Sequence, residues 1–158
     1  MFKEIKATDI KENIVDLLKN NWGLVTAGNN EKYNMMTVSW GAMGELWGKD
    51  SVTVYIRPQR YTEEFMNAFD HFTLSFFSLD KKQAVHGVCG SKSGRDVNKT
   101  EACGLILTRQ HHTLKRQSLF LFVKKWLRVS LTLRNLLTIL LRINGIPKRI
   151  FIIFILQR

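Results

Sequence analysis

The sequence has few of the residues that define several common protein classes. It contains two cysteines and two prolines in 158 residues. Cys89 and Cys103 lie far apart without a CxxC motif, and no segment has the pattern of a signal peptide. These features exclude a disulfide-rich secreted scaffold and predict reduced thiols in a cytoplasmic protein.

Motifs for nucleotide binding and hydrolysis are also missing. The sequence has no GxGxxG, no Walker loop and no GxSxG, which argues against a Rossmann site, a P-loop and a hydrolase nucleophile elbow. The histidines do not have the spacing of metal ligands, so we expect no metal site. They are His71, His86, His111 and His112.

Acidic residues are absent from the last third of the chain. All 13 Asp and Glu lie within residues 1–101, where they balance the basic residues, so the formal net charge of +11 belongs to residues 102–158. A nucleic-acid-binding arm is disfavoured because the basic residues alternate with Leu and Ile and no binding motif accompanies them. The longest apolar runs are far shorter than the ~20 residues of a spanning helix, although a helix lying on a membrane surface stays open.

A third hypothesis is that the tail is translated out of frame. The neighbouring reading frame permits TPYFEEAEFVLVCKKM from Gln110 to Trp126 and DKWYPKKDFH from Arg142 to Ile152. Both strings restore acidic residues and strand-like alternation, so we favour this hypothesis. It divides the chain into a domain at residues 1–105 and an aberrant tail at residues 106–158, and it predicts that the closing strands of the domain are missing.

Alternating apolar runs between Gly and Asn turns predict a small antiparallel barrel. A helix is predicted where apolar residues recur at helical spacing, with Thr8 or Asp9 as its cap. In Ser51–Arg57, Val52, Val54 and Ile56 are expected to face inward. The predicted elements are a helix at Thr8–Asn20, strands at Trp22–Ala27, Met35–Trp40, Ser51–Arg57 and His71–Phe77, a helix from Thr62, and one or two helical turns in Lys81–Val88.

The segment Arg57–Thr62 has the composition of a phosphate site. Two arginines and two hydroxyls precede Glu63, and a helix that begins at Thr62 directs its positive end toward an anion. The alternative is a surface arginine pair beside an ordinary helix cap. The loop Gly87–Thr100 combines glycines, hydroxyls and charged residues, which fits either a ligand-binding loop or a solvated one.

Four separated motifs resemble the flavin reductase-like, FMN-binding split-barrel family, in its flavoredoxin-like branch. They are Trp22–Gly28, NMMTVSWG from Asn34, RPQRYT from Arg57, and SGRD from Ser93 with Lys99. The resemblance covers about residues 1–105. It implies a mainly β fold with a few helices, an antiparallel Greek-key split barrel of six strands, usually dimeric, that binds FMN. The strings from the neighbouring frame also resemble the rest of this family.

The resemblance implies a cofactor site without a catalytic side chain. The Arg57 and Arg60 guanidiniums would hold the phosphate, the Thr37 and Ser39 hydroxyls would line the ring edge, and Lys99 and Ser93 would donate near the ring. Whether Trp40 shields a ring face or fills the core stays open. The cofactor-binding residues are predicted to be Asn34, Met35, Met36, Thr37, Val38, Ser39, Trp40, Arg57, Arg60, Tyr61, Thr62, Ser93, Gly94, Arg95 and Lys99.

The expected function is that of an FMN-dependent oxidoreductase, with NAD(P)H or a protein as electron donor. We expect a cytoplasmic homodimer that binds no nucleic acid. The alternatives are an FMN-binding electron carrier without a substrate of its own, a non-functional truncated product, and a membrane-surface binding module.

Overall fold

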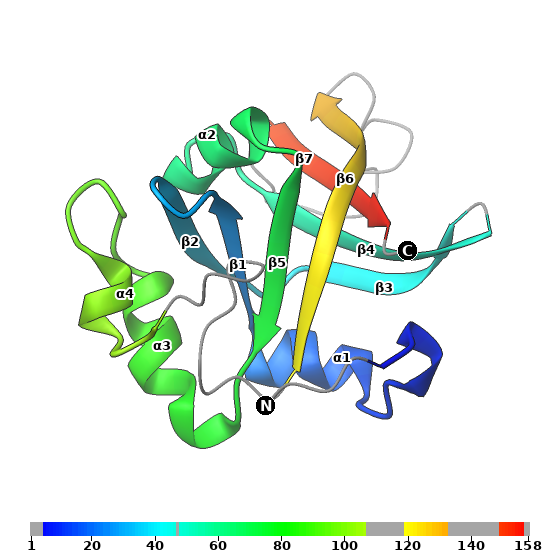
Figure 1. Ribbon diagram of the computed structural model, residues 1–158, viewed down its shortest axis with the longest axis horizontal. Coiled ribbons are helices and arrows are strands. Elements are labelled where there is room, and N and C mark those ends of the chain that lie inside the picture. The colour runs from blue at the N-terminus through cyan, green and yellow to red at the C-terminus, as the bar shows by residue number, and fades with distance from the viewer. Residues whose placement is uncertain (1–4, 47, 107–118, 133–148, 157–158) are drawn as a thin grey trace.

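A single antiparallel sheet organises the chain (Figure 1). The computed structural model describes residues 5–46, 48–106, 119–132 and 149–156. In this part of the chain the sheet has seven strands in the order β2-β1-β5-β6-β7-β4-β3. The strands are β1 (Gly23–Gly28), β2 (Tyr33–Val38), β3 (Gly41–Leu46), β4 (Lys49–Ile56), β5 (His71–Phe76), β6 (Leu119–Thr132) and β7 (Arg149–Leu156).

The helices are short and lie around the sheet. Figure 1 shows α2 at one end of the sheet, α1 at the other, and α3 with α4 together on one side. They are η1 (Ala7–Asp9), α1 (Ile14–Asp16), η2 (Leu17–Asn21), α2 (Tyr61–Ala68), η3 (Leu79–Lys81), α3 (Lys82–Cys89) and α4 (Lys99–Ala102). None of the helices in the described ranges is long and apolar enough to cross a membrane.

The prediction of a single helix over Thr8–Asn20, capped by Thr8 or Asp9, is wrong. The structure has a short 3₁₀ turn, η1, and then a new helix start at Asn13, whose Oδ1 accepts hydrogen bonds from Val15 N at 3.0 Å and Asp16 N at 3.2 Å. An Asn side chain that caps in this way fixes the start of the helix at the next residue. The apolar spacing was nevertheless informative, because Leu17 and Leu18 are buried.

Strands β1, β2, β4 and β5 confirm the predicted strands to within two residues at each end. A turn closes the β1–β2 hairpin, where Gly28 has φ +131° and Asn29 Oδ1 accepts from Lys32 N at 2.7 Å. Gly28 is needed there because L side chains rarely adopt this backbone conformation.

Strand β3 was not predicted. Its sequence, GAMGEL, has two glycines and little β-branched character, so it carries no local strand signal. Its partner β4 supplies the pairing, with Gly41 opposite Val54 and Leu46 opposite Lys49. In β4 itself, Val52, Val54 and Ile56 are buried as expected. The alternation also predicts that Thr53 faces outward, and this is wrong, because Thr53 is 7% exposed and is buried too.

Two apolar clusters hold the fold together. The larger fills the inside of the curved sheet and contains Val25, Val54, Phe65, Phe72 and Leu74, among others. The smaller lies between the outer face of β1–β2 and the α3 side, and contains Leu24, Met35, Phe77, Val85, Cys89 and Leu105. Strand β1 is buried at every position because both of its faces are covered.

The tail contributes two strands. β6 pairs with β5 through Phe76 opposite Leu119, and β7 pairs with β4 through Ile56 opposite Phe151. Leu121 and Val123 are buried in the larger cluster. These strands occupy the closing positions that an out-of-frame tail was expected to leave empty, and the described sheet has seven strands where the resemblance implied six.

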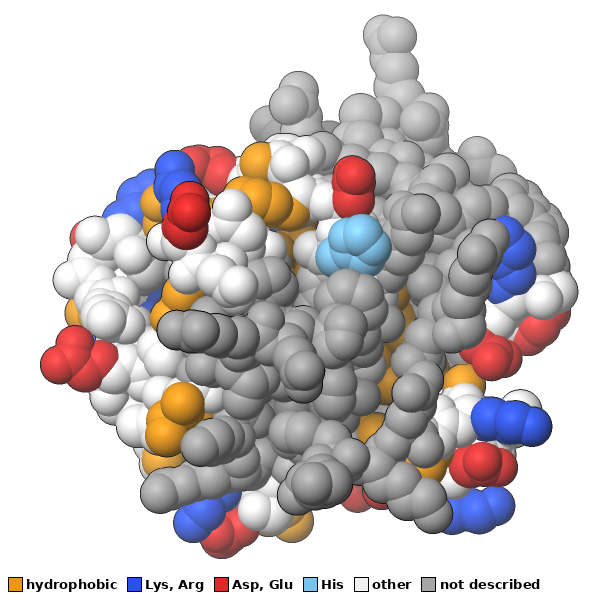
Figure 2. All heavy atoms as spheres, in the orientation of Figure 1, with side chains coloured by type: hydrophobic (Ala, Val, Ile, Leu, Met, Phe, Trp, Pro, Cys, Tyr) orange, Lys and Arg blue, Asp and Glu red, His pale blue; other side chains and the backbone are white. Residues whose placement is uncertain are grey.

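Charged side chains of both signs are distributed around one face of the molecule. In Figure 2 the acidic and basic side chains of the described residues lie around the outline of this face.

Candidate functional site

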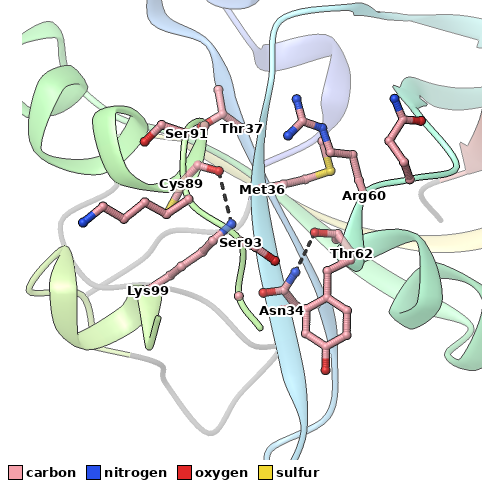
Figure 3. Close-up of a pocket in the computed structure, with 14 residues that line it drawn as sticks. Asn34, Met36, Thr37, Arg60, Thr62, Cys89, Ser91, Ser93 and Lys99 are labelled. Atoms are coloured by element: carbon pink, nitrogen blue, oxygen red, sulfur yellow. Dashed lines mark hydrogen bonds between the residues drawn. The ribbon is translucent and has the colours of Figure 1, made fainter. Parts of the chain in front are cut away.

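A pocket lies where the start of α2, strand β2 and the segment after α3 meet (Figure 3). The space between its walls, including the open mouth, is about 510 Å³. Its lining residues are Asn34, Met36, Thr37, Gln59, Arg60, Tyr61, Thr62, Cys89, Gly90, Ser91, Lys92, Ser93, Gly94 and Lys99.

The lining of this pocket is cationic. It includes Arg60, Lys92 and Lys99, and no Asp or Glu is among the lining residues. Burial and then the nearby charge of Arg57 lower the pKa of Arg60. The Arg60 charge also contributes, after burial, to a lowered pKa of Lys99. Cations that repel one another in a partly buried site favour an anionic ligand.

The first wall of the pocket is the start of α2. Arg60 is the N-cap residue with extended backbone, and the helix begins at Tyr61, one residue before the start at Thr62 that the sequence predicted. The Arg60 Nε is buried without a hydrogen-bond partner among the described residues. The positive end of the helix therefore coincides with an unpaired guanidinium N–H.

Asn34 links this wall to the strand. Its Nδ2 donates to Thr62 Oγ1 at 2.8 Å, and both side chains are buried. Figure 3 shows the two side chains pointing toward one another between β2 and α2. Gly94 packs against the same amide, so closely that a Cβ at this position would collide with Asn34 Oδ1. A glycine is thus required where the loop passes over the strand.

The floor of the pocket is β2, and a buried histidine supports it. Thr37 Oγ1 lies 2.8 Å from His86 Nδ1, and His86 is 3% exposed. The Trp22 and Phe77 rings contact the imidazole edge-on, with centroid distances of 5.9 and 6.2 Å. Burial, with a smaller effect of Lys82, lowers the pKa of His86 to about 4. The imidazole is therefore neutral at pH 7 and orients the Thr37 hydroxyl.

The second wall is the segment from Cys89 to Lys99, the first residue of α4. Lys99 is 6% exposed, and its Nζ donates to Met35 O at 2.8 Å and to Cys89 O at 3.2 Å. Two of its three N–H groups are thus held by backbone carbonyls of the protein. Ser91 and Ser93 add hydroxyls to the same wall, and Ser93 Oγ accepts from Arg95 N at 3.2 Å.

Arg95 joins the two walls from outside. Its guanidinium forms an ion pair with Glu64 and lies 4.2 Å from the centre of the Tyr61 ring. Both side chains of the ion pair are more than half exposed. Arg95 was predicted to bind the cofactor, but it is not among the lining residues, and the structure places it in contact with α2.

The structure brings most of the predicted site residues together. Nine of them line the pocket, namely Asn34, Met36, Thr37, Arg60, Tyr61, Thr62, Ser93, Gly94 and Lys99. The others do not. Met35 and Val38 are buried in the two clusters, Ser39 and Trp40 are exposed beyond the end of β2, and Arg57 and Arg95 lie outside the lining.

Sequence reasoning missed several contributors. Gln59, Cys89, Gly90, Ser91 and Lys92 line the pocket without having been assigned to it. Cys89 to Lys92 belong to the polar segment that had been noted as a candidate ligand loop. His86 had been considered only as a metal ligand. Its position among the apolar residues of a helical turn was the available signal of a buried, supporting role.

The comparison with known families agrees with this fold. The model of the flavin reductase-like domain matches residues 16–120, from the end of α1 into β6. The chain belongs to the flavin reductase-like domain family. The match extends past residue 105, where the resemblance in sequence ended. No functionally curated protein matches the chain.

Several solved structures share the fold at low sequence identity. An FMN-binding domain of a flavin reductase-like enzyme from Shewanella baltica has a TM-score of 0.62 and 20% identity, with 89% of this chain and 69% of that one covered. Flavoredoxin from Methanosarcina acetivorans has a TM-score of 0.61 and 18% identity over 98% and 73% of the two chains. An FMN-binding protein from Thermus thermophilus with bound p-hydroxybenzaldehyde has a TM-score of 0.64 and 16% identity over 99% and 80%.

Proposed function

We propose that this protein is an FMN-dependent oxidoreductase. The observation that carries the proposal is the pocket itself, which is lined by three cations and no carboxylate and opens beside a helix start. The names of the structures that share the fold, which include FMN-binding proteins and a flavoredoxin, support FMN as the ligand.

The donor set fits the phosphate of FMN at the first wall. A phosphate dianion needs charge-assisted hydrogen bonds from a guanidinium together with N–H groups or hydroxyls. Arg60 offers a buried Nε without a partner among the described residues, and the first turn of α2 adds the positive end of a helix. Arg57, outside the lining, adds positive charge behind Arg60.

The floor and the second wall fit the ring. The Thr37 hydroxyl, held by His86, and the Ser93 hydroxyl, on the loop, both belong to the pocket and would offer hydrogen bonds to a polar ring edge. Lys99 holds the second wall in place through hydrogen bonds to Met35 O and Cys89 O. Its positive charge would stabilise negative charge on the part of a bound ring that lies near this wall. Bound FMN supplies the redox chemistry, while these residues bind and orient it.

The electron donor is proposed to be NAD(P)H or a protein. An anaerobic stopped-flow experiment tests this after FMN has been loaded and excess FMN removed. Rapid loss of flavin absorbance on mixing with NADH or NADPH supports a reductase. Absence of FMN binding by equilibrium titration would contradict the proposal as a whole, because the pocket would then serve another anion.

An electron carrier is the second candidate, favoured by the similarity to a flavoredoxin. A carrier holds FMN in the same pocket but has no nicotinamide reaction of its own. Retention of FMN without bleaching by NADH or NADPH, together with reduction by dithionite, would support the carrier over the reductase.

The tail requires its own control. We compare this chain with a version in which one base is restored near codons 104–110. We propose that the restored version is more soluble and binds FMN more tightly, because its tail regains acidic residues and strand alternation. Equal solubility and equal FMN occupancy would contradict an out-of-frame tail.

The same preparations, run on a size-exclusion column, test the proposed homodimer. Cytoplasmic localisation stays a prediction.

A further inference from the structure

The two cysteines of the sequence meet beside the pocket. Cys89 Sγ and Cys103 Sγ are 3.7 Å apart, and both thiols are free. Cys89 ends α3, is buried and lines the pocket, whereas Cys103 follows α4 and is half-buried. A chain with only two cysteines has thus placed their sulfurs in van der Waals contact.

The segments that carry the two sulfurs are both anchored. The Cys103 thiol lies 3.7 Å from Val85 O, and Asn98 Oδ1 caps α4 by accepting from Glu101 N at 3.3 Å. Lys99 Nζ donates to the carbonyl of Cys89 itself, which ties α4 to the end of α3 (Figure 3). A disulfide requires an S–S separation of about 2.05 Å, so the sulfurs must close by less than 2 Å between segments that already touch.

We propose that Cys89 and Cys103 are a dithiol–disulfide pair that takes a low-molecular-weight disulfide as its oxidant. The more exposed Cys103 sulfur attacks the small disulfide, forms a mixed disulfide and releases one small thiol. Cys89 sulfur then attacks the Cys103 sulfur and releases the second small thiol. The protein loses two protons and two electrons, and the oxidant takes them up to become two thiols.

The environment of the pair affects how readily it reacts. Burial, with the neighbouring Cys103 next, raises the pKa of Cys89 to about 12, and burial also raises the pKa of Cys103. Both thiols are therefore protonated near neutral pH, and because the thiolate is the attacking form, we expect oxidation to be faster at alkaline pH.

The bond would fix the second wall of the pocket. The closed loop runs from Cys89 to Cys103 and contains Ser91, Ser93 and Lys99, all of which line the pocket. Holding a binding loop in its bound conformation raises affinity because less order is lost on binding. This part rests on the proposed function, and we expect FMN to bind roughly threefold or more tightly to the oxidised form.

Oxidation by glutathione disulfide tests the pair directly. The protein is incubated with glutathione disulfide, blocked with an alkylating agent and digested with trypsin without reductant. We expect the intact chain to lose two hydrogens, to gain no alkyl group, and to yield peptide 83–92 joined to peptide 100–109. Persistence of both thiols, stable glutathione adducts or disulfide-linked dimers would overturn the proposal.

Single serine variants assign the two roles. In Cys89→Ser we expect Cys103 to retain one glutathione, because no second thiol displaces it. In Cys103→Ser we expect Cys89 to stay reduced, because it is 2% exposed. The reverse pattern would overturn the assignment of Cys103 as the attacking sulfur. The wild-type measurement stands without these variants if either fails to fold.

FMN titration of the reduced and oxidised wild-type protein tests the effect on the pocket. Equal affinity of the two forms would overturn the link to the pocket. Absence of FMN binding in both forms, with the joined peptides present, would refute the proposed function and leave the disulfide pair in place.

Discussion

The two walls of the pocket carry similar charges but use them differently. On the α2 wall, Arg60 has a buried Nε without a partner in the described part of the chain. On the loop wall, Lys99 is bound to two backbone carbonyls, and Arg95, just outside, is paired with Glu64. An anion is held by cations that are available, so the α2 wall is where a phosphate is expected, and the loop wall is organised by its own cations.

The first way to test this comparison is to remove the buried cation of the loop wall. We expect Lys99→Ala to lower the free energy of unfolding by about 4 kcal/mol, because two buried carbonyls lose their donor. Urea denaturation measures the change. The matched control is Lys92→Ala, an exposed lysine on the same wall, which should change stability by less than ~0.5 kcal/mol. Similar values for the two variants would show that Lys99 is not structural.

The second prediction concerns the floor that separates the walls. His86 has a pKa of about 4 in the folded chain, against 6.5 ordinarily. Between these values the unfolded chain binds a proton that the folded chain excludes, so stability falls as the pH drops from 6.5 to about 4. We expect a loss of about 3 kcal/mol from this group at the acid end.

Denaturation near neutral pH and near pH 4 measures this loss, and His86→Gln should remove most of the pH dependence. His71→Gln is the matched histidine control, and it should leave the pH dependence in place. An unchanged pH dependence in His86→Gln would mean that other groups cause it.

The third prediction tests the available cation of the α2 wall. We expect Arg60→Ala to weaken FMN binding about 30-fold, since a hydrogen bond to a charged group contributes about 2 kcal/mol. Riboflavin, which lacks the phosphate, should bind both proteins equally. Fluorescence titration with the two ligands measures this difference. Equal losses for FMN and riboflavin would place the Arg60 contact at the ring.

The fourth and smallest effect is expected at the exposed ion pair between Arg95 and Glu64. Arg95→Ala removes an ion pair whose partners are both more than half exposed, and such pairs contribute little. We expect FMN affinity to change less than about threefold. The control is Glu64→Gln, which should give the same small change. A loss as large as that of Arg60→Ala would show that Arg95 leaves Glu64 to bind the ligand.

Local sequence predicted the elements that carry a local signal. Strands β1, β2, β4 and β5 followed from apolar alternation and from Gly and Asn turns, and α2 from its apolar spacing and acidic first turn. Strand β3 could not be predicted in this way, because its two glycines give no propensity and its partner β4 imposes the pairing. The prediction of one helix over Thr8–Asn20 was wrong because the Asn13 side chain caps a helix that starts only at Ile14, whatever the apolar spacing before it.

The candidate site divides in the same manner. The motifs named most of the lining residues, because a phosphate site needs arginines and hydroxyls in a recognisable order. The motifs did not reveal which of these cations is free to bind a ligand. Lys99 and Arg95 were both predicted to bind a ligand. The structure shows that Lys99 donates to the carbonyls of Met35 and Cys89, and that Arg95 forms an ion pair with Glu64. Both cations therefore already have partners within the protein.

The sequence alone determined the family resemblance, the alternation of the central strands and the presence of an anion-binding motif, because each depends on residues close together in the chain. The tertiary structure alone decided three other features: the contact between Cys89 and Cys103, the support of Thr37 by His86, and the order of the strands. These depend on segments far apart in the sequence, whose distances are set by packing of the whole chain.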